Sequence, residues 1–438
     1  MSNQTVKFKT IAHYLEHYAE PLVREETVLA LSEFDTIIVI PIFDESENQI
    51  QQFLNFNNQT NTLMVWVFNV PDTQTGQSSH LRTKAVFNAL LAQLEGQKIG
   101  EQLWQAEIHE SLSLLLLDRC HDVLIPAKQG VGLARKLGMD LALKLILDQF
   151  ERTGKQVQWV HSTDADVELP PDYGVIPEQE SWVSACVYPF KHLPEEQYFR
   201  AMQEYEFSLH YYVQSLKAAG SPYAFHTIGS LIAVSAVAYA QVRGMPKRAG
   251  AEDFYLLNKL QKVGEVKSLT SPCIAIAGRP SQRVPFGTGP ALLKIQALHE
   301  KHGEYRVYHP RVFKILKQVL DCVALIEHIS SDEDVLFSAL EVKLRDADEF
   351  RAVRTIFESF SWHKQRDHLG QQKTPERLRS AFHTWFDGFL TLRFIHELRD
   401  RIYPNIEISR LPAILLKEPI IGVDVDYSEW FDVLGISG

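Results

Sequence analysis

Two aspartates separated by one residue, Asp164 and Asp166, carry the clearest chemical signal in the sequence. They follow an apolar run around Trp159 that predicts a buried strand, so both carboxylates would stand at the end of that strand. Carboxylate oxygens suit Mg²⁺ and Mn²⁺, and such sites commonly complete their shell with substrate phosphates. The pair predicts a divalent-cation site, with a solvated acidic turn as the alternative. The same pattern at Asp346 and Asp348 falls in a charged helical stretch and predicts only that alternative.

Two further groups of polar residues close predicted strands. Pro41 lacks an N–H and is expected to end the first strand, and Phe43, Asp44 and Glu45 follow it directly. Asn69 closes the second strand, where an amide could contact a nucleotide base. Side chains at such strand ends can face a ligand in the crevice of an α/β sheet. A strand terminator, a helix N-cap and an ordinary turn asparagine are the structural alternatives.

Two predicted helix starts add candidate residues. Gly130 and Gly132 lie at the start of the predicted helix that carries Arg135. The free backbone N–H groups at a helix start can bind a phosphate group. Arg135 would then contribute to cofactor or donor binding, or it would support packing. Glu252 and Asp253 open another helix. They either stabilise the positive end of the helix dipole, or supply a base that the dipole keeps ionised.

The loop that runs from Arg279 to Gly289 contains a second arginine, Arg283, and two glycines near its end. Arginines bind phosphate oxygens in pairs, and glycines permit large changes of backbone conformation. The composition predicts a mobile segment that closes over a diphosphate when the donor binds. A surface linker between two parts of the chain is the alternative.

The elements that must position these residues follow from the apolar pattern. Continuous apolar runs, several of them rich in β-branched residues, predict buried strands at residues 36–43, 63–70, 112–117, 157–160 and 182–188. A helical period with leucines four apart covers residues 132–150. Strands that alternate with helices predict an α/β fold with a largely parallel sheet, in which ligands bind at the carboxyl ends of the strands.

The chain is expected to have three parts: a helical segment at 1–33, the α/β domain at 34–310, and a mainly helical region at 311–438. In the last part Phe382, Trp385 and Phe389 follow a helical period. This stripe is too apolar to face water, which predicts core packing or a contact between copies of the chain in a homo-oligomer.

Composition narrows the functional class. The chain of 438 residues has 44 Lys and Arg against 55 Asp and Glu, a net charge of −11, which argues against a general nucleic-acid binder. Its apolar runs are too short for a transmembrane segment, and its first residues lack the apolar core of a signal peptide. The cysteines are far apart among apolar neighbours and are expected to be buried thiols: Cys120, Cys186, Cys273 and Cys322. A cytoplasmic protein is expected.

Four of these motifs occur in an order that resembles the GT-A class of glycosyltransferases, and most closely its large family 2. The order is Pro-X-Phe-Asp-Glu, a Gly-led helix with Ala-Arg, Asp-Ala-Asp, and Glu-Asp, and the resemblance covers about residues 34 to 290. It implies a GT-A, Rossmann-like α/β sandwich that binds a nucleotide diphosphate sugar, with the mainly helical C-terminal region outside the match.

The resemblance also implies roles for individual residues. Asp166 would bind Mn²⁺ or Mg²⁺ directly, and Asp164 would face the donor ribose or sugar while contributing to the metal site. Asp253 would be the general base for the acceptor hydroxyl, with Glu252 beside it. Arg279 or Arg283, both in the loop from Arg279 to Gly289, would bind the diphosphate as a second positive group beside the metal ion.

The nucleotide side of the site is implied in the same way. The segment from Pro41 through Phe43 and Asp44 to Glu45 would border the nucleotide, and Asn69 would contact the base. Two features depart from the family. Asp44 stands where the family more often has Asn, and the family's second aspartate-bearing turn is replaced here by the sequence Asn-Val-Pro-Asp that starts at Asn69.

The implied reaction is direct displacement at the anomeric carbon with inversion, on an acceptor that the sequence does not identify. Two alternatives stay open. Asp164-Ala165-Asp166-Val167 also fits the nucleophile motif of haloacid-dehalogenase-type phosphatases, with Asp164 as nucleophile. The chain could instead be a non-catalytic nucleotide-sugar-binding protein.

Overall fold

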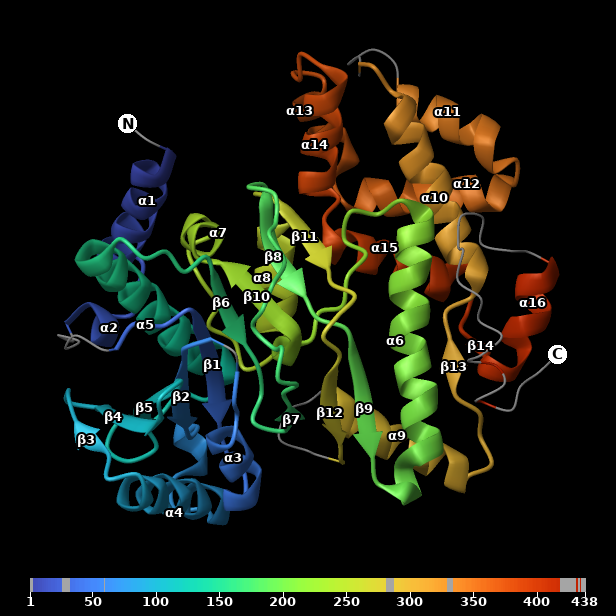
Figure 1. Ribbon diagram of the computed structural model, residues 1–438. Coiled ribbons are helices and arrows are strands. Elements are labelled where there is room, and N and C mark those ends of the chain that lie inside the picture. The colour runs from blue at the N-terminus through green and yellow to red at the C-terminus, as the bar shows by residue number, and fades with distance from the viewer. Residues whose placement is uncertain are drawn as a thin grey trace. The chain divides into compact units, whose positions relative to one another are not determined.

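The computed structural model describes residues 3–25, 32–58, 60–280, 287–328 and 334–417, together with 431 and 434 (Figure 1). The chain divides into two compact units. The α/β unit contains the described residues up to 193 and residues 227–278, and the helical unit contains residues 194–226, 279–280 and the described residues from 287 onward. Each unit is described by itself.

The α/β unit is built on a nine-stranded mixed sheet. Across the sheet the order is β11 (Glu265–Ser268), β8 (Val183–Val187), β10 (Ile232–Ser235), β6 (Trp159–Ser162), β1 (Thr36–Ile42), β2 (Thr62–Asn69), β5 (Leu112–Arg119), β4 (Leu103–His109) and β3 (Gln97–Lys98). The four central strands, β6, β1, β2 and β5, run parallel. They coincide with four of the predicted apolar runs and β8 with the fifth, so the expected α/β fold is confirmed.

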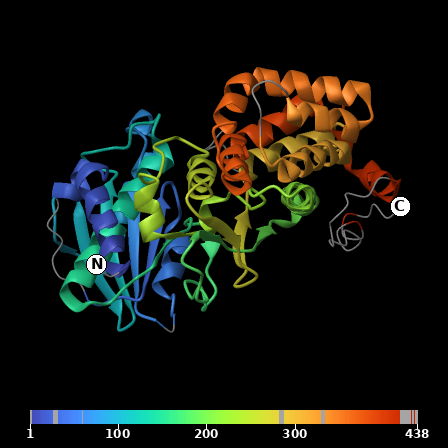
Figure 2. The same cartoon turned by 90° about the horizontal axis from the view of Figure 1, so that it is seen from above.

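Helices cover both faces of the central strands (Figures 1 and 2). α5 (Gly130–Thr153) packs across β1 and β2, where Gly138 lies so close that an added Cβ would be 2.4 Å from Val39 and 3.0 Å from Val67. The next residue of β2, Phe68, points to the opposite face. There it meets Phe87 of α4 (Ser78–Gln93) edge to face, with ring centroids 5.0 Å apart.

The N-terminal helix α1 (Asn3–His17) is joined to α5 by a buried polar network. The Tyr14 hydroxyl donates to Asp140 at 2.5 Å, and Lys136 donates to Tyr14 at 2.6 Å and to Asp140 at 3.0 Å. Because these groups satisfy one another, burying them costs less than burying them singly. The first helical segment is therefore part of the α/β unit.

The remaining elements of this unit are short. Its helices are α2 (Pro21–Glu25), α3 (Glu47–Leu54), α7 (Ala236–Gln241) and α8 (Glu252–Leu260), with 3₁₀ turns at Asp72–Gln74 and Gly229–Leu231. A second, three-stranded sheet has the order β7 (Val167–Glu168), β12 (Ile274–Gly278) and β9 (Phe190–Pro194).

The helical unit, whose helices are drawn in Figure 2, has a hydrophobic core. Its helices are α6 (Phe199–Ala219), α9 (Thr288–Glu300), α10 (Pro310–Leu325), α11 (Val335–Leu344), α12 (Ala347–Ser359), α13 (Trp362–Leu369), α14 (Pro375–Trp385), α15 (Gly388–Arg401) and α16 (Leu411–Lys417). Phe382 is buried in this core and Trp385 packs against it, as core packing of the aromatic stripe requires, whereas Phe389 is 39% exposed.

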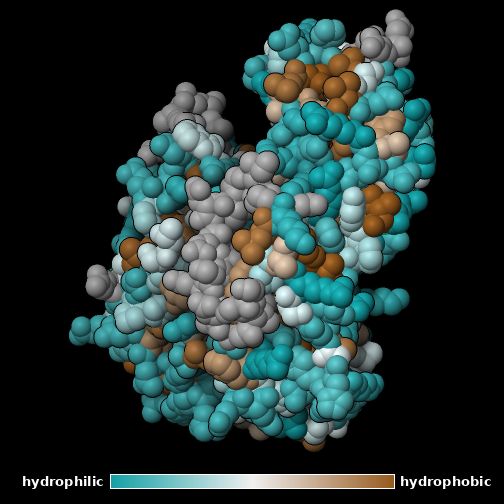
Figure 3. Space-filling model, turned by 90° about the vertical axis from the view of Figure 1, so that its right-hand side faces the viewer, coloured by the Kyte–Doolittle hydropathy of each residue, from teal (hydrophilic) through white to brown (hydrophobic). Residues whose placement is uncertain are grey.

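Two features of this unit differ from the sequence-based expectation. Helices α6 and α9 precede residue 310 but pack with the helical unit, since Phe207 and Tyr211 of α6 share its core with Phe313 of α10. The part after residue 310, which was expected to be mainly helical, also contains the short strand β14 (Ile406–Glu407), which pairs with β13 (Arg306–Val307). The face drawn in Figure 3 is mostly hydrophilic, with apolar side chains gathered in separate patches.

None of the four cysteines, all of them described residues, forms a disulfide. Cys120, Cys186 and Cys322 are buried, as expected, but Cys273 is exposed because it lies in the turn that precedes β12. Within the ranges that the structure describes, no helix has the length and apolar character needed to cross a membrane.

Candidate functional site

The predicted strand-end residues lie along one edge of the sheet. Because β6, β1, β2 and β5 are parallel, their carboxyl ends, at Ser162, Ile42, Asn69 and Arg119, all reach that edge. The segment from Phe43 to Glu45 and the segment from Thr163 to Asp166 therefore follow adjacent strands, β1 and β6. This is the edge at which open α/β sheets bind ligands.

Arg135 joins two of the predicted motifs. It extends from α5, is 3% exposed, and donates from Nη1 to Glu252 Oε1 at 3.2 Å. Its Nη2 forms a short ion pair with Asp164 Oδ1, and its Nε lies 3.4 Å from the Ser162 hydroxyl oxygen. The strand-end aspartate and the start of α8 thus meet on one buried cation. A guanidinium suits this position because its planar fork can serve two carboxylates at once.

Gly229 makes room for that cation. A Cβ added at Gly229 would lie 2.4 Å from Nη2 and 2.7 Å from Cζ of Arg135. A side chain at this position would displace the guanidinium from its two carboxylates. Neither Gly229 nor Ser162 was assigned a role from the sequence, and no local pattern marks either of them as a partner of a residue in α5.

The α8 start carries two carboxyl groups with altered acidity. Burial, and next the charge of Glu252, raise the pKa of Asp253 to about 7, and Arg135 opposes this rise. Burial also raises the pKa of Glu252, which Arg135 offsets only in part. Ala251, directly before them, has a φ of +58°, a left-handed conformation that a non-glycine residue adopts at a cost. A left-handed residue directly before two neighbouring carboxyl groups with raised pKa values is typical of functional sites.

The two aspartates of the predicted metal site differ in their surroundings. The Asp164 side chain is 35% exposed and is already paired with Arg135, whereas Asp166 is half-buried and its carbonyl oxygen accepts the Ala277 N–H at 2.9 Å. Among the residues that the structure describes, no third His, Cys or acidic side chain stands with them in a metal-ligating group. Two carboxylates suit a Mg²⁺-like ion, which usually keeps waters and substrate phosphates as its other ligands.

The nucleotide-side segment is held by α4. Asp44 has a φ of +57°, its N–H donates to Thr83 Oγ1 at 3.0 Å, and its Oδ1 is paired with Arg82 at 2.6 Å. Its neighbour Glu45 is 6% exposed and Phe43 is half-buried. The Asp44 carboxylate therefore orders the turn that borders the sheet edge.

Pro41 does not end β1, contrary to expectation, since the strand continues through Ile42 along β2. The Thr163 N–H donates to the Val39 carbonyl oxygen, so the polar backbone groups of Val39, and of Pro41 two residues on, face β6. The pairing of β1 with β6 ends at Val39 and Ser162. Pro41 lies beyond the last residue pair between β1 and β6, so its missing N–H costs no hydrogen bond to β6.

Asn69 lies at the end of β2 and is 5% exposed, yet its Oδ1 has no hydrogen-bond partner among the described residues. A buried amide oxygen without a partner costs roughly 1–3 kcal/mol. A ligand that supplies a hydrogen-bond donor at this edge would recover that cost. This gives a physical reason for the predicted contact between Asn69 and a nucleotide base.

The predicted phosphate site at the start of α5 is not supported. The Gly132 N–H donates to the Arg248 carbonyl oxygen at 3.0 Å, and a Cβ at Gly132 would lie 2.5 Å from the Pro246 carbonyl oxygen. At Gly130 a Cβ would lie 2.7 Å from the Ala249 backbone. Both glycines allow residues 246–249 to pack against the helix start, and that backbone stands where a phosphate would have to bind.

The predicted closing loop falls largely outside the described residues, which exclude 281–286 and hence Arg283. Arg279 is half-buried directly after β12 and belongs to the helical unit. Two residues before it, Ala277 bonds to the Asp166 backbone. The predicted binding of the donor diphosphate by Arg279 or Arg283 stays a prediction.

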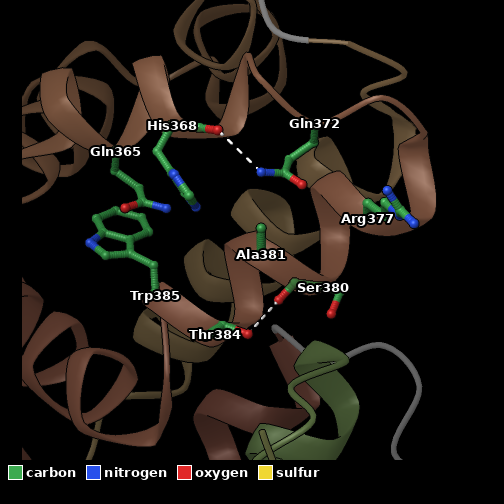
Figure 4. Close-up of a pocket in the computed structure, with 8 residues that line it drawn as sticks. All are labelled: Gln365, His368, Gln372, Arg377, Ser380, Ala381, Thr384 and Trp385. Carbon is green, nitrogen blue, oxygen red and sulfur yellow. Dashed lines mark hydrogen bonds between the residues drawn. The ribbon is translucent and has the colours of Figure 1, made fainter.

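A separate hollow lies within the helical unit. A pocket of about 460 Å³ lies between α13 and α14. Figure 4 shows Gln365 beside the Trp385 ring and His368 pointing into the space. None of the residues predicted to carry chemistry lines this pocket.

Comparison with known proteins identifies no family. No family model matches the chain, and no curated protein matches it. Among solved structures the chain is similar to residues 1–349 of S. aureus TarS, crystallised in complex with UDP-GlcNAc. The identity is 10%, the match covers 83% of this chain and 91% of that chain, and the TM-score is 0.35.

Proposed function

We propose that this protein is a glycosyltransferase that takes a sugar from a nucleotide diphosphate donor. The observation that carries the proposal is that the strand-end Asp164 and Glu252, at the start of α8, both pair with the same buried cation, Arg135. These carboxylates belong to motifs 88 residues apart (252 minus 164), and in the resembled glycosyltransferases the same two motifs serve the donor and the acceptor.

The donor end of the site has the chemistry that a nucleotide diphosphate needs. Asp166, together with the Asp164 oxygen that Arg135 does not hold, would bind Mn²⁺ or Mg²⁺. Such an ion, when bound, neutralises charge that develops on the departing diphosphate. Asn69 would supply the base contact through its unpartnered amide oxygen, and the turn from Pro41 through Phe43 and Asp44 to Glu45 would border the nucleoside.

The acceptor end has a carboxyl group suited to proton removal. With a pKa of about 7, about half of the Asp253 side chains are ionised at neutral pH, and the carboxylate is basic enough to take a proton from a hydroxyl in the transition state. The acceptor oxygen would attack the anomeric carbon as the bond from that carbon to the diphosphate oxygen breaks. The electron pair leaves with the diphosphate, Asp253 receives the proton, and configuration is inverted.

Two observations bear on the alternatives. The Asp164 oxygen held by Arg135 is part of an ion pair, which makes it a poorer nucleophile and weighs against a phosphatase that forms an aspartyl phosphate. The raised pKa of Asp253 weighs against a purely binding protein, because a binding site has no need of a base tuned to neutral pH.

The test is hydrolysis or transfer measured with a panel of nucleotide diphosphate sugars, with Mn²⁺, with Mg²⁺ and with a chelator. We expect metal-dependent release of a nucleoside diphosphate from one donor, and loss of that release in Asp253→Asn. Binding of a nucleotide sugar without any turnover would favour the non-catalytic alternative. Trapping of a phosphorylated Asp164 would favour the phosphatase.

A further inference from the structure

A second group of metal-ligating side chains lies at the end of β5, and the proposed transfer reaction does not use it. Asp118, Cys120 and His121 each offer one ligand atom, and the three atoms lie within 4.8 Å of one another. This is the one such group within the residues that the structure describes. We propose that these three side chains form a zinc site, independent of the proposed glycosyl transfer.

Two of the three separations between the ligand atoms are close to those that zinc requires. Cys120 Sγ lies 3.5 Å from His121 Nδ1, and His121 Nδ1 lies 2.9 Å from Asp118 Oδ2. Around a tetrahedral Zn²⁺, bonds of about 2.3 Å to sulfur and about 2.0 Å to nitrogen or oxygen put neighbouring ligand atoms about 3.3–3.5 Å apart. The sulfur–nitrogen pair already has this separation, and the nitrogen–oxygen pair must open by only a few tenths of an ångström.

The backbone holds the carboxylate in position. Asp118 Oδ1 accepts the Cys120 N–H at 2.9 Å and the His121 N–H at 3.1 Å, so the turn directs the second oxygen toward the histidine. The His121 ring is fixed in turn by edge-to-face contact with Phe87, at 5.3 Å between centroids. Zinc sites depend on such outer contacts, which orient the ligands before the ion arrives.

A buried histidine holds the turn itself. His80 Nδ1 accepts the Gly76 N–H at 2.9 Å, so its Nε2 carries the proton and donates to the Cys120 carbonyl oxygen at 2.8 Å. Cys120 is fully buried, whereas the His121 side chain is 23% exposed. The fourth position of a bound ion would therefore be reached from the histidine side, by water or by another oxygen ligand.

The choice of zinc follows from the donor atoms. A thiolate and an imidazole favour Zn²⁺ over Mg²⁺ or Mn²⁺, whereas Asp164 and Asp166 offer only oxygen and favour the harder ions. On binding, the ion takes the place of the thiol proton, which passes to solvent. The hydrogen bond from His121 to Asp118 is replaced by two bonds to the metal, with the imidazole proton on Nε2.

Cobalt tests the site without reference to activity, because a Co²⁺–thiolate bond absorbs in the near ultraviolet. The full chain, freed of metal by a chelator, is titrated with Co²⁺ alone, and Zn²⁺ is then added. We expect one Co²⁺ per chain with a thiolate band that Zn²⁺ abolishes. The band should vanish in Cys120→Ser, and binding should weaken by roughly tenfold or more in His121→Ala.

Two controls separate this site from the rest of the chain. Cys273→Ser removes the exposed thiol and should leave the band unchanged, as should Asp166→Ala at the oxygen-only pair. His121→Ala, whose side chain is partly exposed, keeps the test valid if Cys120→Ser does not fold. Absence of a thiolate band in the wild-type chain, or a band of undiminished affinity in His121→Ala, overturns the proposal.

Discussion

Arg135 and Glu252 form a fully buried ion pair, 3.2 Å from Nη1 to Oε1, with side chains that are 4% and 5% exposed. The pair joins α5 to α8 at the edge of the sheet where Asp164 also binds the same cation. Buried charges are retained only when they are paired, so removal of the shared partner affects both carboxylates at once.

Arg135→Ala should therefore destabilise the chain by about 3–5 kcal/mol near pH 8, because it leaves two carboxylates without their cation. Arg135→Lys should recover only part of this, since an ammonium lacks the fork that serves both. Arg351→Ala is the control, as its ion pair with Asp348 is exposed and worth at most about 1 kcal/mol. Urea unfolding measures all three. Equal losses for the Arg135 and Arg351 variants would contradict a structural role for the buried pair.

Gly229→Ala should displace the Arg135 guanidinium, because the added Cβ would lie 2.4 Å from Nη2. We expect a loss of roughly 2–3 kcal/mol of stability, as for other overpacked sites, and weaker donor binding. Gly154→Ala is the matched control. It has a φ of +75° and no atom within 4 Å of the new Cβ, so only backbone strain of roughly 1 kcal/mol is expected. If Gly229→Ala behaves like the control, the close approach has no energetic consequence.

The central sheet could be predicted because its strands are buried on both faces and hence read as continuous apolar runs, as at Thr62–Asn69. The strand β4 was missed for the opposite reason. Its residues are buried, half-buried or exposed in no regular order, so its sequence has neither a continuous apolar run nor a regular alternation. Helix α6 was predicted neither as an element nor as part of the helical unit, since an apolar face indicates burial without indicating the partner.

The site was predictable residue by residue but not as a network. Strand ends and helix starts mark Asp164, Glu252 and Asp253 as candidates, and each carries a recognisable local signal. The bridging role of Arg135 has none, because its partners lie 29 and 117 residues away in the chain and meet it only through the packing of α5, β6 and α8. The glycines at the start of α5 were misinterpreted for the same reason, since their close contact is with residues 246–249.

Asp166→Ala should abolish the metal dependence of donor binding while leaving the fold intact, because the residue lies in a half-buried strand-end loop. Calorimetric titration of a nucleoside diphosphate with and without Mn²⁺ is the measurement. Asp348→Ala, in the second Asp-Ala-Asp sequence, is the control, since that aspartate is 77% exposed at the start of α12. Affinity that is equal with and without Mn²⁺ in the wild-type chain would remove the metal from the proposed mechanism.

Asp253→Asn should become more stable than the wild-type chain as the pH rises. The raised pKa means that the folded state holds the Asp253 proton more tightly than the unfolded chain between pH 3.8 and about 7, so wild-type stability falls through that window. Asparagine removes the charge, so the variant should gain free energy of unfolding over the wild-type chain. The gain should be near zero at pH 4 and roughly 1–3 kcal/mol at pH 8. This range is below the value of about 1.4 kcal/mol for each unit of the Asp253 shift, because Glu252 contributes part of that shift. A pH-independent difference in melting temperature would show that Asp253 is not the group perturbed.

Asp253→Asn should at the same time lower transfer by two to four orders of magnitude, which is the usual contribution of a general base. The wild-type rate at low substrate should fall below pH 7, since the base must be ionised and burial raises its pKa to about 7. In the variant the remaining rate should lack this acidic limb, because asparagine does not titrate. Donor affinity should change little, which separates loss of the base from loss of the site. A purely structural role at the start of α8 predicts another result. The asparagine side-chain oxygen could still accept the Phe254 N–H, as Asp253 Oδ1 does at 2.7 Å, and the variant would keep most of its rate. Measurement of kcat/KM from pH 5 to 9 for both proteins decides between the two roles.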